Sequence, residues 1–266
     1  MPRENHYIAL DLETTGLDPR RDRIIEIGAE RFDREGRVIE SFERLINPGR
    51  PVAPSAAAIN GLRDADLADA PRAAEVLPDF VGFLDRGPGA PLIAHNASFD
   101  AGFLGMEFVR AGMAIPGRRI VDTLPLARST LTELRSHRLD LLVAHLGIAP
   151  RAHHRALADA AAVRGIWLRL AGPSIPGEDL VSYAIHDGSQ PTRPPLGWER
   201  LDEAVSRSRP VRIAYTGGSR GAAPRVVTPR SFAHRGGIAY VVATCHLEAI
   251  EKSFRLDRIT SYEVLD

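Results

Sequence analysis

The chain has 266 residues, enough for one large domain or two of modest size, and 44% of them are hydrophobic and 26% charged. This composition excludes a disordered tail, a collagen-like repeat and a small fold held together by disulfides. The 34 basic residues balance the 34 acidic residues, so the formal charge is zero and any nucleic-acid binding must depend on a local patch.

Three strands are predicted at the start of the chain. Turn residues separate them, at Gly16, at Asp18-Pro19 and at Glu35-Gly36, which predicts an antiparallel meander. The predicted strands are Tyr7 to Leu12, Ile24 to Phe32 and Val38 to Ile46.

Helices and two short apolar strands follow. The segment from Ala73 to Leu84 places its apolar residues at helical spacing and predicts an amphipathic helix. The remaining elements are predicted as strands at Pro91 to Ala94 and Ile120-Val121, and as helices at Ala97 to Ala111, Leu139 to Leu146 and Ala156 to Leu170. We therefore expect an α/β domain in which helices cover the faces of a mixed sheet.

Proline and glycine become frequent after Ala171, and this composition is typical of a linker. Beyond it, a short helix is predicted at Leu201 to Val205. Five short strands separated by glycine turns predict a small β-barrel, at Val211 to Tyr215, Arg225 to Thr228, Ala239 to Thr244, Glu251 to Leu256 and Ser261 to Leu265. We expect residues 1–172 and 196–266 to form two domains, joined by residues 173–195.

Two acids lie at the end of the first predicted strand. Asp11 and Glu13 are two residues apart, so strand alternation points both carboxylates to one face. A pair of acids on an edge strand is ordinarily solvated. Here Ile8, Leu10 and Leu12 indicate a buried strand, in which unpaired carboxylates would be costly. The pattern therefore predicts a cation beside them.

Two further segments place acids near helix starts. His95-Asn-Ala-Ser-Phe-Asp100 follows a predicted buried strand, where Ser98 or Asp100 could instead serve as a helix cap. In His154-Arg-Ala-Leu-Ala-Asp159, the histidine and the aspartate lie five residues apart, about 140° around a helix. His154 would therefore reach the same site only from the first turn or the preceding loop, and His153 is its alternative.

These segments, in this order, resemble the three motifs of the DEDDh 3'-5' exonucleases, the DnaQ-like family that includes polymerase epsilon subunits and the RNase T group. The matching patterns are Asp-x-Glu-Thr-Thr-Gly, His-Asn-Ala-x-Phe-Asp and His-x-Ala-x-x-Asp. The resemblance covers about residues 5–171 and implies an RNase H-like fold, in agreement with the predicted mixed sheet.

The resemblance implies a site for two Mg²⁺ or Mn²⁺ ions, with Asp11, Glu13, Asp100 and Asp159 as ligands. In such a site, water activated at one ion attacks the terminal phosphodiester, and charge on the leaving 3' oxygen is stabilised at the other. His154 would act as general base, and nucleoside 5'-monophosphates would be released.

The same resemblance implies contacts with the 3' end of a nucleic-acid strand. Thr14, Thr15 and Leu17 match family positions that contact the terminal nucleotide, and Asn96 and Phe99 would line its pocket. Turn formation and core packing are the alternative roles of these residues.

The carboxyl-terminal region contains an acid-free basic stretch from Ala204 to Leu247 with seven arginines. It could hold a phosphate backbone, or it could be a solvated surface neutralised by acids elsewhere. The segments Val211-Arg-Ile-Ala-Tyr215, Arg225-Val-Val-Thr-Pro229, Tyr240-Val-Val-Ala243 and Phe254-Arg-Leu-Asp-Arg-Ile259 resemble those of a WYL domain. The resemblance covers about residues 196–266 and implies an Sm- or SH3-like β-barrel that binds nucleic acid or a ligand and regulates attached domains. Arg225, Arg255 and Arg258 are the candidate contacts, although Arg258 could instead pair with Asp257.

Cys245 is the only cysteine, so no intrachain disulfide can form and a reducing setting is expected. The segment from Met1 to Tyr7 lacks the apolar stretch of a secretory signal, and no apolar run approaches the ~20 residues that span a bilayer. We therefore expect a cytoplasmic protein without a membrane partner.

The sequence thus predicts a metal-dependent 3'-5' exonuclease that acts on single-stranded DNA, alone or with polymerase or repair proteins. One alternative is an RNase T-like exoribonuclease. The other is a regulator in which the carboxyl-terminal domain senses a ligand or a nucleic acid and the exonuclease fold only binds.

Overall fold

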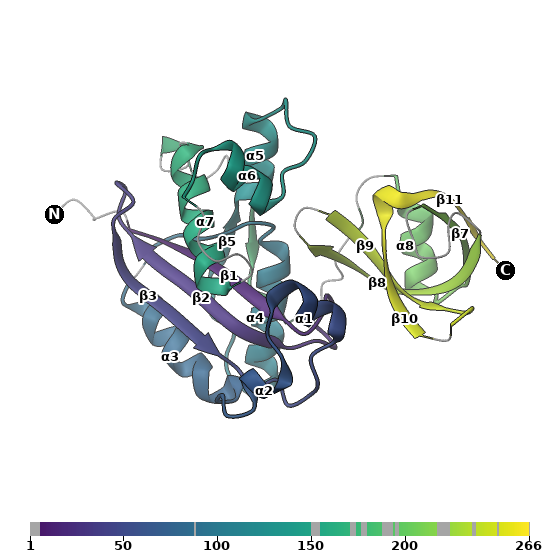
Figure 1. Cartoon of the computed structure of the whole chain (residues 1–266), viewed down its shortest axis with the longest axis horizontal. Helices are drawn as coiled ribbons and strands as arrows, with labels where there is room; N and C mark the ends of the chain where they lie inside the picture. Colours follow the sequence, from purple (N-terminus) through teal and green to yellow (C-terminus); the bar gives the residue numbers. More distant parts are fainter. Residues whose placement is uncertain are drawn as a thin grey trace. The chain divides into compact units, whose positions relative to one another are not determined.

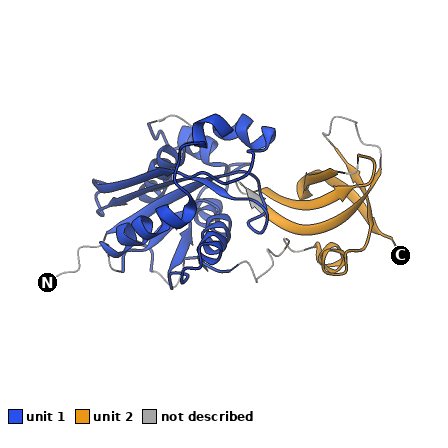
Figure 2. Cartoon of the chain, turned by 90° about the horizontal axis from the view of Figure 1, so that it is seen from below, with its two compact units in different colours: residues 1–189 blue, residues 190–266 orange. Residues whose placement is uncertain are grey.

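The computed structural model describes residues 6–87, 89–149, 155–170, 174–176, 180–187, 194, 197–216, 224–235, 238–248 and 250–265. The chain divides into two compact units, residues 1–189 and 190–266, which are coloured separately in Figure 2. Each unit has its own hydrophobic core. No helix in the described ranges combines the length and the apolar character needed to cross a membrane.

A mixed six-stranded sheet forms the centre of the first unit. Its strands are β1 (Tyr7–Thr14), β2 (Ile24–Phe32), β3 (Val38–Leu45), β4 (Leu92–Ala94), β5 (Arg119–Asp122) and β6 (Ser182–Ala184), in the spatial order β3-β2-β1-β4-β5-β6. The first three strands pair antiparallel, and β4 and β5 extend the sheet in parallel with β1. This arrangement confirms the predicted α/β class, its opening meander and its mixed sheet.

Seven helices are described in this unit: α1 (Pro54–Asn60), α2 (Asp64–Leu67), α3 (Ala73–Asp85), α4 (Ser98–Arg110), α5 (Thr123–Thr130), α6 (Leu139–His145) and α7 (Ala156–Arg169). Figure 1 shows α7 on one face of the sheet and α3 on the other. The short helices α1, α2 and α5 were not predicted. The four residues of α2 are too few to establish a helical period.

Strand β1 is buried on both faces of the sheet. Ile8 and Leu10 pack in the larger core, which includes residues of α3 and α4, whereas Tyr7 and Ala9 pack with Trp167 of α7. Side chains alternate between the two faces of a strand, so Asp11 and Glu13 continue the row of Tyr7 and Ala9. The two carboxylates therefore lie on the face that α7 covers.

The sheet of the first unit extends into the stretch that we predicted to be a linker. Within residues 173–195, Ser182–Ala184 form β6 and pair antiparallel with β5. Ile185 is 6% exposed and belongs to the larger core. The proline and glycine content of the flanking segments conceals the short apolar run that makes this strand. The domain boundaries stay a proposal.

The second unit is a small β domain that begins with helix α8 (Glu199–Ser206). Its strands are β7 (Val211–Tyr215), β8 (Arg225–Arg235), β9 (Ile238–Cys245), β10 (Ile250–Arg255) and β11 (Ile259–Val264), with the 3-10 helix η3 (Leu256–Arg258) before the last. They form an antiparallel sheet in the order β10-β9-β8-β7-β11. The predicted helix and five strands are all present, and β8 extends seven residues beyond its predicted end at Thr228.

Close packing of α4 on the segment after β6 gives a test of this fold. A Cβ atom at Gly105 would lie 1.7 Å from the carbonyl oxygen of His186, whereas the nearest atom to a Cβ at Gly82 of α3 is Arg86 Nη1 at 3.7 Å. We predict that Gly105→Ala lowers the free energy of unfolding by about 1–3 kcal/mol. Gly82→Ala should raise it by up to about 1 kcal/mol through helix propensity. Thermal denaturation of both variants checks this, and equal stability of Gly105→Ala and wild type would contradict the packing.

Candidate active site

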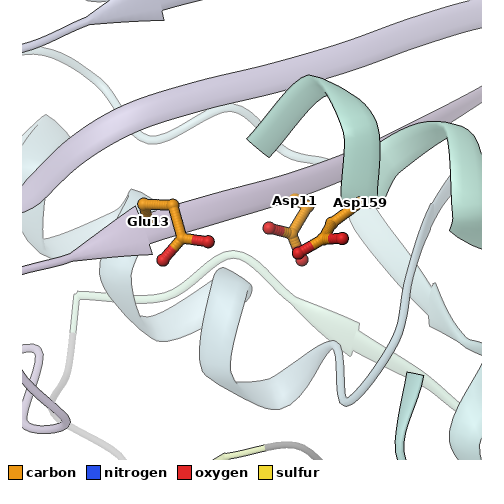
Figure 3. A group of neighbouring side chains, drawn as sticks. All are labelled: Asp11, Glu13 and Asp159. Atoms are coloured by element: carbon orange, nitrogen blue, oxygen red, sulfur yellow. The ribbon is translucent and has the colours of Figure 1, made fainter. Parts of the chain in front are cut away.

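Two carboxylates of strand β1 and one of helix α7 converge in the first unit. One oxygen from each of Asp11, Glu13 and Asp159 lies within 4.8 Å of the others. In Figure 3 the side chains of Asp11 and Asp159 approach each other. Glu13 lies further along β1, the strand that also carries Asp11. Glu13 and Asp159 are only 4% and 8% exposed. The structure thus brings together three of the four predicted metal ligands.

Local structure explains why these carboxylates meet. Asp11 and Glu13 share one face of β1, as strand alternation predicts. Asp159 lies in the first turn of α7, which packs on that face of β1 and β2. Asp11 is opposite Gly28 of β2, where the absence of a side chain leaves room for the start of α7.

Asp100, the fourth predicted ligand, lies in the first turn of α4 and is 4% exposed. It is not part of the 4.8 Å group. Burial raises the pKa of Asp100 well above its usual range, and the negative charges of Asp122 and Glu13 raise it further. The influence of Glu13 indicates that Asp100 borders the same carboxylate cluster.

The turn that leads into α4 is held by a buried carboxylate. Asn96 has a left-handed backbone (φ 69°), which is uncommon for a residue other than glycine. Asp122 Oδ1 accepts hydrogen bonds from the backbone N–H groups of Asn96 (2.8 Å) and Leu124 (2.9 Å). One side chain therefore caps α5 and fixes the turn four residues before Asp100. Burial raises the pKa of Asp122, although backbone hydrogen bonds from Leu124, Asn96 and Ala97 oppose this.

His95 belongs to the same turn and is held in its neutral form. Its Nε2 lies 2.8 Å from the carbonyl oxygen of His137, and its Nδ1 lies 2.9 Å from Thr123 Oγ1. A carbonyl only accepts, so Nε2 carries the proton in the neutral ring. Burial lowers the pKa of His95 to about 4, and the positive charge of Arg128 contributes to this shift.

Internal hydrogen bonds occupy the threonines predicted to contact a terminal nucleotide. Thr14 Oγ1 donates to the carbonyl of Gly16 (2.7 Å). Thr15 Oγ1 donates to Asp22 Oδ1 (3.3 Å) and accepts from the backbone N–H of Arg23 (3.0 Å). These bonds support the turn role that the sequence left open for both residues, and contact with a nucleotide stays a prediction.

The other residues predicted to line the nucleotide pocket differ in exposure. Leu17 is partly exposed in the loop after β1. Asn96 is 5% exposed. Phe99 is partly buried, and its ring centre lies 4.6 Å from that of Phe103. Core packing therefore accounts for much of Phe99, and its role in the pocket stays a prediction.

An ion pair that the sequence analysis did not anticipate anchors the loop after β1 to α4. Glu107 is 0% exposed and binds Arg23 through two hydrogen bonds of 2.7 and 2.8 Å. Arg110 also contacts Glu107 and donates to the carbonyls of Pro19 and Asp22. A sequence signal was present, because Glu107 and Arg110 lie near an apolar helix face. The partner of Glu107, however, is Arg23, which lies 84 residues away in the sequence.

His154, the predicted general base, lies outside the described residues, as does His153. The described residues resume at Arg155, which directly precedes Ala156, the first residue of α7. The catalytic role of His154 therefore stays a prediction.

In the second unit, two of the three candidate ligand contacts interact with other residues of the protein, and the role of all three stays a prediction. Arg225 is 7% exposed, and its guanidinium lies 6.0 Å from the ring centre of Tyr215. Arg255 binds Asp257 through hydrogen bonds of 3.0 and 2.6 Å. Arg258, which the sequence suggested as a partner of Asp257, is partly exposed.

The basic stretch from Ala204 to Leu247 is partly neutralised by acids that flank it. Arg207 pairs with Glu203 at 3.0 Å, and Arg212 pairs with Glu263. Arg230 is exposed and donates to Thr244 Oγ1 (3.4 Å). These pairs match the neutralised surface that the sequence left as an alternative, and they lower the charge available for a phosphate backbone.

The carboxylate site fits a hard divalent cation. Its donors are all oxygens, which suits Mg²⁺ or Mn²⁺. Three carboxylates at this separation repel one another, and their burial weakens solvent screening of that repulsion. A bound cation would remove this electrostatic cost.

Comparison with protein families identifies both units. Residues 8–166 match the RNase T model, which is described as an exonuclease, and residues 198–264 match the WYL domain model. The exonuclease match covers more than half of the chain. The chain therefore belongs to this exonuclease family and contains a WYL domain.

Individual relatives agree with this assignment. The chain is 40% identical over 164 residues to the PolC-type DNA polymerase III of Thermotoga petrophila and 41% identical over 164 residues to that of Thermotoga maritima. Each match covers 61% of this chain but only 12% of the polymerase, so the chain spans about an eighth of these relatives' length.

A solved structure shows the same fold at lower identity. The nuclease domain of 3'hExo, a DEDDh family member bound to rAMP, superposes with a TM-score of 0.57 at 16% identity, over 68% of this chain and 98% of that one. This similarity confirms the RNase H-like exonuclease fold.

The buried His95 predicts a pH dependence of stability. A folded-state pKa near 4, against about 6.5 in the unfolded chain, means that acid favours unfolding, so His95 should cost about 2 kcal/mol at pH 5 relative to pH 8. The loss begins below pH 6.5 and is complete below pH 4. Urea unfolding at both pH values should show a smaller acid loss for His95→Gln than for wild type. Identical losses would contradict a neutral, buried His95.

Proposed function

We propose that the chain is a metal-dependent 3'-5' exonuclease that removes nucleoside 5'-monophosphates from the 3' end of single-stranded DNA. The observation that supports this most strongly is the buried convergence of Asp11, Glu13 and Asp159 in a chain of the exonuclease family. A binding-only domain would gain nothing from concentrating negative charge where a phosphate backbone must approach.

The proposed ligands are Asp11, Glu13, Asp100 and Asp159, with two Mg²⁺ or Mn²⁺ ions as cofactors. Divalent ions held there would supply Lewis-acid stabilisation of negative charge and would lower the pKa of bound water. Asp100 would contribute its carboxylate from the start of α4, where Asp122 fixes the preceding turn. His154 would accept the proton of the attacking water.

DNA is the proposed substrate because the similar proteins are DNA polymerases. The loop after β1 would border the terminal nucleotide, since it begins two residues after Glu13 and the ion pair of Arg23 with the buried Glu107 holds its far end. We further propose that the WYL domain binds nucleic acid or regulates the exonuclease, and that the protein works in the cytoplasm in DNA replication or repair, alone or with a polymerase.

A nuclease assay tests the activity and its polarity. We expect wild-type protein with Mg²⁺ to shorten a 5'-labelled single-stranded oligodeoxynucleotide into a ladder, and to release a labelled mononucleotide from the 3'-labelled strand. Asp11→Asn should lower the rate by more than about 100-fold, because a ligand matters at least as much as its supporting shell. Asp79→Asn, at an exposed position of α3, is the matched control. Degradation from the 5' end, or full activity of Asp11→Asn, would contradict the proposal.

Metal binding should also stabilise the protein. At a Mn²⁺ concentration 100 times Kd, we expect a gain of about 2.7 kcal/mol and a rise of several degrees in Tm. Asp11→Asn should lose this rise, yet in EDTA it should be at least as stable as wild type because one repelling charge is gone. Thermal scans with Mn²⁺ and with EDTA check both statements. An equal Mn²⁺ shift in both proteins would place the metal elsewhere.

A further inference from the structure

Two buried glutamates on β2 connect this strand to α7. Glu26 is 0% exposed and binds Arg155, and Glu30 is 2% exposed and binds Arg164 at 2.8 Å. The glutamates lie four residues apart along the strand, about 13 Å at 3.3 Å per residue. The arginines lie nine residues apart, about 13.5 Å along a helix. Similar spacing on the two elements lets α7 lie along β2 with one ion pair just before its first residue and another near its middle.

The pair at the site end is more extensive than the other. Glu26 accepts hydrogen bonds from Arg155 Nη2 (2.6 Å) and Nε (3.0 Å), and its second oxygen accepts from the backbone N–H of Ala156 (3.0 Å). Ala156 is the first residue of α7, so this carboxylate caps the helix amino terminus. The hydrogen bond with Glu26 raises the pKa of Arg155. The negative charge of Glu13 also contributes to this rise.

This cap leads directly to the metal ligands. Glu26 is opposite Glu13 in the antiparallel pairing of β1 and β2. The carbonyl of Arg155 accepts the hydrogen bond from the backbone N–H of Asp159 (3.0 Å). Glu26 therefore contacts, through Arg155 and Ala156, the single helical turn from which Asp159 projects.

Direct contact between backbones makes this position sensitive. A Cβ atom at Gly28, the residue opposite Asp11, would lie 2.1 Å from the backbone of Ala156 and Leu157. The first turn of α7 therefore rests on the strand beside Asp11 with no side chain between them. A small displacement of this turn would change the separation of the Asp11 and Asp159 carboxylates.

We propose that Glu26 is a positioning residue of the metal centre, which holds the first turn of α7 against β2 so that Asp159 meets Asp11 and Glu13. This inference rests on the proposed function, because it assumes that those carboxylates bind divalent metal. Glu26 touches neither substrate nor metal in this scheme. Glu30, which pairs with Arg164 near the middle of the helix, contributes to stability alone in this scheme.

The experiment compares two matched substitutions, Glu26→Gln and Glu30→Gln. Each removes one buried charge from β2 and deprives Arg155 or Arg164 of its charged main partner, so both variants should lose thermal stability in EDTA. Calorimetric titration with Mn²⁺ should give a Kd about 10- to 100-fold higher for Glu26→Gln than for wild type. For Glu30→Gln, the Kd should stay within about twofold of wild type, because its site is distant from the ligands.

Hydrogen exchange in metal-free protein provides a second measurement that does not depend on metal. The amides of Ala156 to Asp159 should exchange faster in Glu26→Gln than in Glu30→Gln, since only the first variant replaces the charged cap of the helix with a weaker, neutral acceptor. If Glu26→Gln fails to fold, Glu26→Asp serves in its place. Its shorter side chain keeps the charge but cannot reach both Arg155 and Ala156, so it should also weaken Mn²⁺ binding.

The outcomes separate this inference from the proposed function. If the wild-type protein binds no Mn²⁺, the proposed function fails, and the role of Glu26 fails with it. If wild type binds Mn²⁺ and the glutamate variants bind it equally well, only the positioning role is overturned. Selective weakening in the Glu26 variants, with faster exchange at the start of α7, supports it.

Discussion

Mutual repulsion of carboxylates is the constraint on which the site depends. Asp11, Glu13 and Asp159 lie within 4.8 Å of one another, and Asp100 borders them in a buried position. Such an arrangement opposes folding unless a cation offsets it or a carboxyl group takes up a proton. Burial and the charges of Asp122 and Glu13 raise the pKa of Asp100, which favours the second response. A divalent ion would allow every carboxylate to ionise.

The fold supplies the energy that holds these charges together. Strand β1 is covered on both faces, so Asp11 and Glu13 are anchored by apolar neighbours on the same strand. Ion pairs of buried glutamates then fix the elements around the site, with Glu26 and Arg155 at the start of α7 and Glu107 and Arg23 at the loop after β1. Because each pair joins residues far apart in sequence, the site is a junction between elements rather than a property of one segment.

Strand and helix periodicity predicted much of this architecture. Alternation along β1 placed Asp11 and Glu13 on one face, and the helix expected from Ala156 contains Asp159 in its first turn. The position of Asp100 followed from an apolar strand that leads into a helix. These features are local, so a few neighbouring residues specify them.

Long-range partners could not be predicted in the same way. Glu26 and Arg155 are 129 residues apart, and no spacing rule connects them. A signal for Glu26 itself was present, because it is an acid within an apolar strand, as Asp11 is. In the second unit, Arg225 on β8 is buried beside Tyr215. Counting charges along the sequence cannot show that one of the arginines points into the core. The strand at Ser182–Ala184 was missed because proline and glycine surround it.

Anomalous X-ray scattering from a crystal soaked in Mn²⁺ locates bound metal without reference to activity. We predict two manganese peaks about 3.5 to 4 Å apart. Their ligands should be the carboxylate oxygens of Asp11, Glu13, Asp100 and Asp159. A crystal with no peak among these four side chains, or with manganese bound only elsewhere, would contradict this prediction.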